Sequence, residues 1–202
     1  VFAESTADSV LLLENNTFEN IATSSVSVQM GADGTVALLD IESVTTAASS
    51  SFFGAVECEG GSGTASLSCG IDRHQVSGLT PPVNGECFQL LNVLEAQVIA
   101  STCEIPLTRG VDVFFETGPT GTRQLDVSGN QFSEAPGGGI RIGVSSALTS
   151  TPVHGSIIGN QLSFVNNAAA ITFSGDTTEA QLNFTGNFYA SGSSIDVGAA
   201  SC

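Results

Sequence analysis

The feature that most constrains this chain is a spaced pattern of residues that occurs four times. In each copy an Asn has apolar residues five and three positions before it, an apolar residue two positions after it, and an apolar pair roughly ten and twelve positions after it. Gly155 takes the place of the first apolar residue in one copy. Short period-two stretches that return every few tens of residues predict a stacked repeat of β-strands. The central residues of the four copies are Asn16, Asn130, Asn160 and Asn187.

The Asn residues suit tight corners between strands. Asn is one of the few non-Gly residues that adopt the left-handed backbone conformation at low cost. A Gly precedes it in three copies, at Gly129, Gly159 and Gly186. We expect stacking to place the four Asn side chains above one another as a ladder of hydrogen-bonded amides. The apolar residue two positions later is expected to point inward and stack in the same way.

Residues 125–132 and 139–142 together resemble the repeat of right-handed parallel β-helix, or pectin-lyase-like, proteins. Further segments that match this repeat are residues 8–28, 156–173 and 181–197. The resemblance implies one all-β domain over residues 1–202, a right-handed solenoid of about six to seven rungs. It is almost silent on function, because this fold serves lyases, hydrolases, tailspikes, adhesins and surface layers alike.

The repeat is hardest to recognise in the middle of the chain, where the cysteines gather. The Gly-rich text predicts an irregular insertion loop over residues 57–87, stapled by disulfides. The simplest pairing joins Cys58 to Cys69 and Cys87 to Cys103, although three pairings of these four residues are open. Cys202 is then free, pairs between subunits or displaces one of the four. Disulfides would place the chain in an oxidising compartment.

Composition excludes several classes of partner. The chain has no Lys, and four Arg face twenty Asp and Glu, for a formal charge of −16. Phosphate binding needs clustered Lys and Arg, so no nucleic acid partner is expected. No apolar run approaches the length of a membrane span. The abundance of small and β-branched residues favours an extracellular or cell-surface protein.

A search for catalytic motifs of the resembling family argues against an enzyme. Polygalacturonases carry an NTD, an adjacent Asp pair, a GHG and an RIK in that order. This chain offers only echoes, at residues 153–155 (VHG) and 141–143 (RIG), in the wrong order. The Arg or Lys base and the Asp-rich calcium site of the lyases are not visible either. Cys69 beside His74 could form a nucleophile pair, but a disulfide at Cys69 is the preferred interpretation. No cofactor and no metal are therefore expected.

Self-assembly is the function that the pattern favours. Stacked coils have two open ends with unpaired backbone groups, which solenoids usually blunt with a capping element. No amphipathic cap precedes Val10. We therefore expect a secreted structural subunit that binds other copies of itself, forming a filament or surface layer. Assembly would proceed by end-to-end stacking or by exchange of residues 1–13 as a strand. The expected assembly segment is Val10, Leu11, Leu12 and Leu13.

Two alternatives stay open. One is a β-helix that binds or degrades polysaccharide, with glycans as partners, although the single Tyr, Tyr189, occupies a core-type position. The other is a fragment of a large adhesin. Two glycosylation sequons are also present, with Asn15 and Asn183 as the acceptors.

Overall fold

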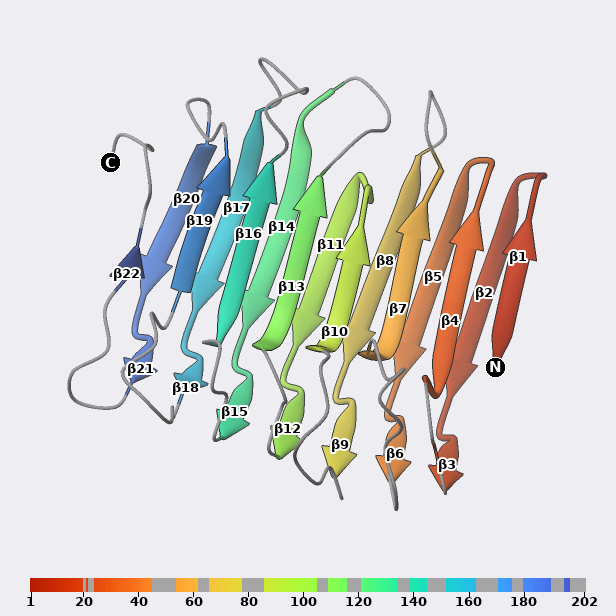
Figure 1. Cartoon of the computed structure of the whole chain (residues 1–202), viewed down its shortest axis with the longest axis horizontal. Helices are drawn as coiled ribbons and strands as arrows, with labels where there is room; N and C mark the ends of the chain where they lie inside the picture. The colour runs from red at the N-terminus through yellow and green to blue at the C-terminus, as the bar shows by residue number, and fades with distance from the viewer. Residues whose placement is uncertain are drawn as a thin grey trace.

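The fold is seen in a computed structural model, which describes most of the chain. The described residues are 1–19, 21, 24–44, 54–61, 66–77, 86–104, 109–115, 121–133, 139–144, 152–162, 171–175, 180–189 and 195–196. They form three parallel β-sheets, here called sheets A, B and C, that run side by side along the long axis of the molecule (Figure 1). The prediction of an all-β parallel solenoid is confirmed.

Each turn of the chain passes through sheets A, B and C in that order, and we call one such set of three strands a rung. The first rung is formed by β1 (Phe2–Ser5), β2 (Ser9–Glu14) and β3 (Thr17–Glu19). Sheet A then continues through β4 (Val26–Met30), β7 (Gly54–Gly60), β10 (Glu86–Leu91), β13 (Arg109–Phe115), β16 (Ile140–Val144), β19 (Ile171–Gly175) and β22 (Ile195–Asp196). Sheet B continues through β5 (Gly34–Leu39), β8 (Leu67–Asp72), β11 (Glu95–Ile99), β14 (Arg123–Ser128), β17 (Val153–Ile158) and β20 (Ala180–Thr185). Sheet C continues through β6 (Glu42–Val44), β9 (Gln75–Ser77), β12 (Thr102–Glu104), β15 (Gln131–Ser133), β18 (Gln161–Leu162) and β21 (Phe188–Tyr189).

Every strand pairs in parallel with the equivalent strand of the next rung, so equivalent side chains stack in rows along the column. Side chains alternate between the two faces of a strand, which turns the period-two sequence pattern into one buried row and one outward row. One buried row of sheet B contains Leu13, Leu38, Ile71, Val98, Val127, Ile157 and Phe184. The core is therefore a continuous column of stacked apolar side chains.

Gly155 interrupts an apolar row for a steric reason. It pairs with Leu125 on one side and Leu182 on the other. A Cβ atom at Gly155 would lie 1.8 Å from the carbonyl oxygen of Leu125, which no neighbour could accommodate without moving backbone. This copy of the repeat thus has Gly instead of an apolar residue because the backbone of the neighbouring strand lies too close for a side chain.

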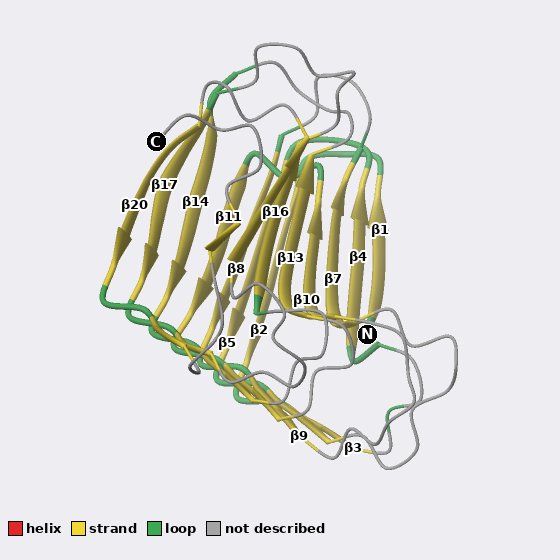
Figure 2. Ribbon diagram, turned by 60° about the vertical axis from the view of Figure 1, so that its left-hand side comes forward, coloured by secondary structure: helices red, strands yellow, loops and turns green. Residues whose placement is uncertain are grey.

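The corner between sheets B and C is the most regular turn of the fold. It has two residues in every rung, and Figure 2 shows these short connections stacked along one edge of sheet B. The first residue of the corner has positive φ, between 48° and 67°, in all seven cases. We had expected the left-handed residue to be the Asn of the repeat, but it is the residue before it. These left-handed residues are Asn15, Asp40, Arg73, Ala100, Gly129, Gly159 and Gly186.

The expected insertion over residues 57–87 is wrong for the part of it that the structure describes. Strands β7, β8 and β9 lie in this region and pair with the strands of both neighbouring rungs. This rung was missed because its corner has Arg73 and His74 in place of Gly and Asn. Residues 62–65 and 78–85 lie outside the described part of the chain.

Residues 1–13 also form regular structure within the chain's own column. β1 pairs with β4, and β2 pairs with β5, over their full lengths. Within the described residues, no helix is long and apolar enough to cross a bilayer.

Candidate functional site: the inner ladder and the two ends

The second residue of each B–C corner points into the column, and three of the four predicted Asn residues meet there. Asn160 Oδ1 accepts hydrogen bonds from the backbone N of Asn130 at 3.0 Å and from its Nδ2 at 2.9 Å. Asn187 Oδ1 accepts the same two bonds from Asn160, at 3.1 Å and 2.9 Å. Asn160 and Asn187 thus each accept two bonds from the Asn of the previous rung.

Each ladder amide also donates a hydrogen bond to a backbone carbonyl of the rung before it. Nδ2 of Asn130 donates to the carbonyl of Val98 at 2.8 Å, and Nδ2 of Asn160 donates to the carbonyl of Val127 at 2.8 Å. Asn187 repeats this bond to Ile157 at 2.7 Å. The acceptor always lies two residues before the left-handed residue of its corner. Both amide hydrogens of Asn130 and Asn160 are therefore used in a core where these residues are almost fully buried.

Toward the N-terminus the ladder continues with other polar groups. Ser101 donates its backbone N to Asn130 Oδ1 at 2.8 Å, and His74 donates its backbone N to Ser101 Oγ at 3.1 Å. His74 Nε2 lies 2.7 Å from Ser43 Oγ, which donates to Ser25 Oγ at 2.8 Å. These five residues form a buried polar thread that the Asn repeat of the sequence did not predict.

Asn16 does not join the ladder of its own chain, contrary to the expectation. The residue beside it in the next rung is Ile41, which has no side-chain donor or acceptor. Nδ2 of the half-buried Asn16 donates instead to the carbonyl of Glu14 at 2.9 Å, in a solvent-exposed hydrogen bond. Asn16 therefore occupies a ladder position without a ladder partner inside the chain.

His74 is the most strongly perturbed titratable group of the thread. Its side chain is fully buried, and burial lowers its pKa from 6.5 to about 3. The ring contacts Phe88 edge-on, with 5.4 Å between ring centroids. Nδ1 has no hydrogen-bond partner. A neutral His74 that binds Ser43 is thus a structural residue of the core at ordinary pH.

The two disulfides lie inside the column and join strands of the same rung. Cys58 of β7 is bonded to Cys69 of β8, with 6.5 Å between Cα atoms. Cys87 of β10 is bonded to Cys103 of β12, with 6.4 Å between Cα atoms. Each bond therefore ties sheet A across the interior to sheet B or sheet C. Cys202 lies outside the described residues.

The residues that echo catalytic motifs do not come together. Arg141 faces outward from sheet A and forms a bidentate ion pair with Asp112 on the neighbouring strand. His154 lies in an outward row of sheet B, beside Gln124 and Gln181. Cys69 is in a disulfide, so the Cys–His nucleophile pair does not exist.

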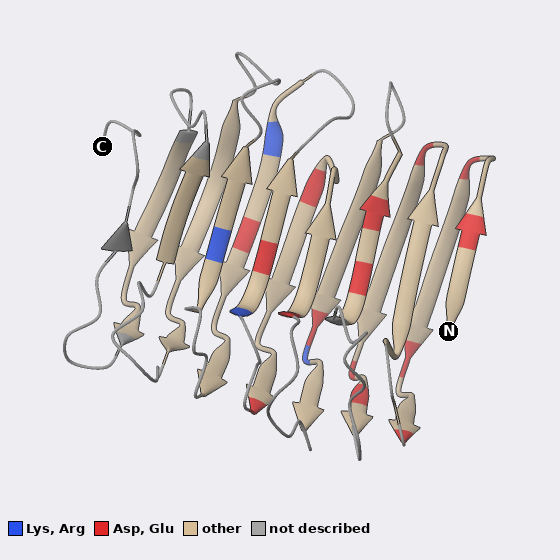
Figure 3. Cartoon of the chain, viewed as in Figure 1, with Lys and Arg blue, Asp and Glu red and all other residues tan. Residues whose placement is uncertain are grey.

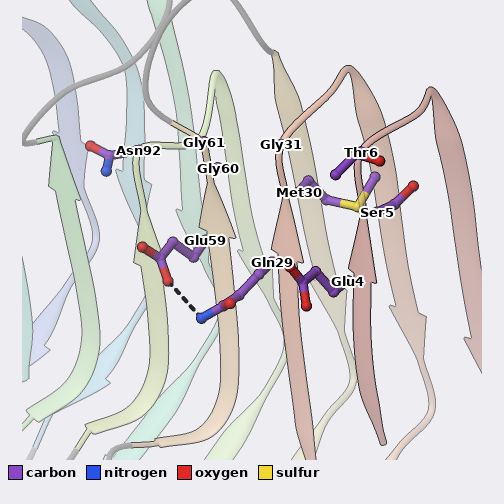
Figure 4. A pocket seen from close by; sticks show the side chains of 10 residues that line it. All are labelled: Glu4, Ser5, Thr6, Gln29, Met30, Gly31, Glu59, Gly60, Gly61 and Asn92. Carbon is purple, nitrogen blue, oxygen red and sulfur yellow. Dashed lines mark hydrogen bonds between the residues drawn. The ribbon is translucent and has the colours of Figure 1, made fainter.

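Sheet A carries an acidic outer face near the N-terminal end, and acidic positions outnumber basic ones in the view of Figure 3. A hollow of about 350 Å³ lies over this face. Figure 4 shows Gln29 and Glu59 meeting across two strands, joined by a hydrogen bond of 3.0 Å, with Glu4 on the next strand. Within the described residues no group of three or more His, Cys, Asp or Glu side chains is arranged to hold a metal ion.

A second hollow, of about 570 Å³, follows the outside of the B–C corner. Arg73 projects here from its left-handed position and binds Asp40 through two hydrogen bonds, of 2.5 and 2.9 Å. These bonds lower the pKa of the Asp40 carboxyl. The side chains of Thr17, Gln75 and Thr102 line the same hollow.

The two ends of the column differ from its middle in apolar exposure. Among the described residues, the large hydrophobic side chains that are exposed all lie in the first rung or in β21. They are Val1, Phe2, Val10, Leu12 and Phe188, with exposed fractions of 49, 67, 79, 57 and 68%. The expected assembly segment thus splits: Val10 and Leu12 point outward, whereas Leu11 and Leu13 point into the core and are half-buried.

Both sequon acceptors are exposed. Asn15 is the left-handed corner residue of the first rung. Asn183 lies in the outward row of β20, where its Oδ1 accepts a hydrogen bond of 3.0 Å from the Thr185 hydroxyl.

Arg123 is a buried cation that the sequence did not single out. Its side chain is fully buried at the start of β14, and its guanidinium group lies 5.5 Å from the centre of the Phe115 ring. Its guanidinium nitrogens have no hydrogen-bond partner, and burial lowers its pKa. The ring face of Phe115 is the one favourable contact for this charge among the described residues.

The three sheets, the stacked corners and the inner ladder define a parallel β-solenoid protein. Comparison with known proteins goes no further than this class. No protein-family model, no curated protein and no solved structure matches the chain.

Proposed function

We propose that this protein is a secreted, non-catalytic structural subunit that assembles with copies of itself into an extracellular filament or surface layer. Assembly occurs by end-to-end stacking of right-handed solenoids, each with seven rungs that correspond to the seven strands of sheets B and C. Right-handed winding is the usual hand of a crossover between parallel strands. The likeness to the pectin-lyase-like repeat then concerns architecture rather than catalysis.

The position of the exposed apolar side chains carries this proposal. Soluble proteins expose single hydrophobic residues all over their surfaces, so scattered ones need no explanation. Here the described ones are confined to the two ends of a column. A patch that gathers at an end is suited to covering by another molecule at that end.

The core itself is incompletely covered at the same places. Among the described residues, every partly buried hydrophobic side chain that packs on the core belongs to the first rung or to β20. In the rungs between, the equivalent positions are closed: Val36 and Leu38 are 1% and 0% exposed, whereas Leu11 and Leu13 remain half-buried. One further rung on either end would complete this burial.

The first rung also has a free strand edge. The backbone N of Ser9 and of Asn15 donates toward β5. Because alternate residues of a parallel strand direct their backbone groups to opposite edges, the N–H of Leu12 points to the other edge of β2. Within the described chain no strand pairs with that edge. An unpaired edge of this kind binds another strand readily.

The disulfides and the acidic charge support an extracellular location. Two buried disulfides form and persist in oxidising compartments. The formal charge of −16 keeps subunits soluble until specific contacts form.

The test is the oligomeric state of the purified chain and of two variants at one position. Leu12→Pro removes the outward N–H but no hydrogen bond of the monomer, since proline is tolerated at a free edge. Leu12→Thr keeps the N–H and removes the large apolar side chain. In sedimentation at rising concentration we expect large assemblies for the unchanged chain, weaker assembly for Leu12→Thr and monomers for Leu12→Pro. Monomers for all three chains, with unchanged circular dichroism, would contradict the proposal.

A second candidate, glycan binding, rests on the hollow along the B–C corner. Its hydroxyl, amide and carboxylate groups are repeated at rung spacing, which suits a polymer of sugars. Retention of the purified chain on polysaccharide beads, lost in Arg73→Ala and Gln75→Ala, would favour this function. Retention of both variants equal to that of the unchanged chain would rule out glycan binding at this hollow.

A further inference from the structure

We propose that the copies stack head to tail in one register. Asn16 of the incoming copy lies on Asn187 of the copy before it, and β1 of the incoming copy replaces β22 of that copy. This inference rests on the proposed function and specifies its contact surface. The partner is a second copy of this chain.

The ladder provides the first reason for this register. Asn187 has used one amide hydrogen on Ile157, and its Oδ1 accepts from Asn160. Its backbone N–H and second amide hydrogen occupy the positions that Asn130 and Asn160 use to bind the next Asn. An Asn above it would therefore continue the ladder, and Asn16 is the Asn at the equivalent position of the first rung.

Asn16 can supply the complementary bonds without rebuilding its corner. Its Oδ1 would accept from Asn187, as Oδ1 of Asn187 accepts from Asn160. Its Nδ2 would turn from the carbonyl of Glu14 to the carbonyl of Phe184, which lies two residues before the left-handed Gly186. Among the described residues Asn16 has Ile41 as its neighbour in the next rung and no Asn on its other side, so the next copy can supply that Asn.

The apolar rows meet in the same register. Leu11 would follow Leu182, and Leu13 would follow Phe184, in the two inward rows of sheet B. All four side chains are half-buried in the single chain. Stacking would bury each of them as Val36 and Leu38 are buried now.

Charge selects head-to-tail stacking over a symmetric pair of heads. The first rung carries Glu4, Asp8, Glu14 and Glu19, whereas residues 180–189 contain no charged side chain. Two heads face to face would bring eight carboxylates together, and no Lys is present to offset them. A head on a tail places the four carboxylates beside the uncharged residues 180–189 instead.

Sheet A requires one strand to move. It has eight strands, and β22 already lies on β19 where β1 of the next copy would sit. Among the described residues β22 pairs with Ile171 and Thr172 of β19, whereas β1 pairs with four residues of β4 in its own chain. The incoming strand can therefore cover more of β19 than β22 covers, and β22 acts as a short placeholder on this edge.

Engineered disulfides test the register. Thr17 and Phe188 are exposed and lie in the same outward row of sheet C, so Thr17 of one copy would follow Phe188 of the next. Neighbouring strands are roughly 4.8 Å apart, which is within the Cα separation of a disulfide. The variants carry Cys202→Ser so that the engineered thiols are the reactive ones.

Mild oxidation of Thr17→Cys/Phe188→Cys should give a ladder of covalent oligomers on a non-reducing gel, which collapses with reductant. Thr17→Cys alone should run as a monomer on this gel. Covalent dimers of this variant would reveal head-to-head contact and overturn the register. Thr17→Cys/Gln181→Cys is the out-of-register control, because Gln181 lies on sheet B, and it should not crosslink.

Two results separate this inference from the function on which it rests. Assembly in the ultracentrifuge without crosslinking of the Thr17–Phe188 pair would overturn the register alone. Absence of assembly would overturn both. Ile195→Pro/Asp196→Pro, which removes β22 as a pairing strand, should make crosslinking several-fold faster. An unchanged or slower rate would overturn the replacement of β22.

Discussion

Asn160 Oδ1 receives two hydrogen bonds from Asn130, one from the backbone N at 3.0 Å and one from Nδ2 at 2.9 Å, in a part of the core where both residues are almost fully buried. Removing Asn160 would leave both donors of Asn130 without an acceptor. A buried unsatisfied donor costs about 1–3 kcal/mol.

Asn160→Ala should therefore lower the free energy of unfolding by about 3 kcal/mol or more, from the two orphaned donors and the lost bond to Val127. Asn16→Ala is the matched control, because its amide makes an exposed bond to Glu14, and it should cost less than about 1 kcal/mol in the monomer. Urea denaturation monitored by circular dichroism measures both. Equal losses in the two variants would show that the ladder does not stabilise the column.

His74 should make stability depend on pH on the acid side of neutrality. Its pKa is about 3 in the folded chain, against 6.5 for an ordinary His, because burial disfavours the charged ring. Above pH 6.5 the His74 ring is neutral in both the folded and the unfolded chain, so its burial costs no stability through protonation. As the pH falls from 6.5 toward 3, the unfolded chain binds a proton that the folded chain refuses, so stability falls by up to about 1.4 kcal/mol per pH unit.

His74→Gln keeps an amide for Ser43 and removes this titration. The difference in unfolding free energy between the two chains should therefore change steadily from pH 6.5 to pH 5, before the carboxylates titrate. A pH-independent difference would mean that His74 is not buried as a neutral ring.

Both disulfides should contribute to stability. Cys58→Ala/Cys69→Ala opens the bond between sheets A and B, and a loop of this size is worth about 3 kcal/mol. Counting thiols in the denatured, unreduced chain should find at most one of the five Cys residues free. Five free thiols would remove the argument for an oxidising compartment.

The left-handed corner residues allow a test in both directions. Ala100 has φ of 48°, a conformation that costs a non-Gly residue about 1–2 kcal/mol, so Ala100→Gly should stabilise the chain by about 0.5–1 kcal/mol after the loss of unfolded-state entropy. Gly129→Ala, at the equivalent position one rung later, should destabilise the chain by a similar amount, because Ala is strained at this positive φ. No steric clash adds to that cost, since a Cβ there contacts nothing closer than 3.9 Å. Melting temperatures that move in the same direction would contradict the assigned corner geometry.

The sequence pattern predicted the rungs clearly where the second corner residue is Asn, and less clearly where other residues perform the same task. At Asp40-Ile41, Arg73-His74 and Ala100-Ser101 the backbone turns in the same way, but neither residue matches the search pattern. The first position needs only tolerance of positive φ, and the second needs only to fill the core. Several residues can do either, so an Asn-based repeat finds only part of the column.

The ends of the column were predicted from general principles of solenoids, but their contacts were not. Leu11 and Leu13 point inward whereas Val10 and Leu12 point outward, because side chains alternate along β2. Which pair faces the core depends on the pairing of β2 with β5. The isolation of Asn16 depends on Ile41, a residue that lies 25 positions away in sequence and next to it in space. Such relationships follow from register, which the sequence pattern left undetermined in the middle of the chain.

Electron microscopy of the purified chain at increasing concentration tests the central claim most directly. Stacked copies should form unbranched filaments in which each copy adds about 34 Å, from the seven strands of sheets B and C at roughly 4.8 Å. Leu12→Pro should give only short single columns under the same conditions. Discrete single columns from the unchanged chain at every concentration would contradict the claim.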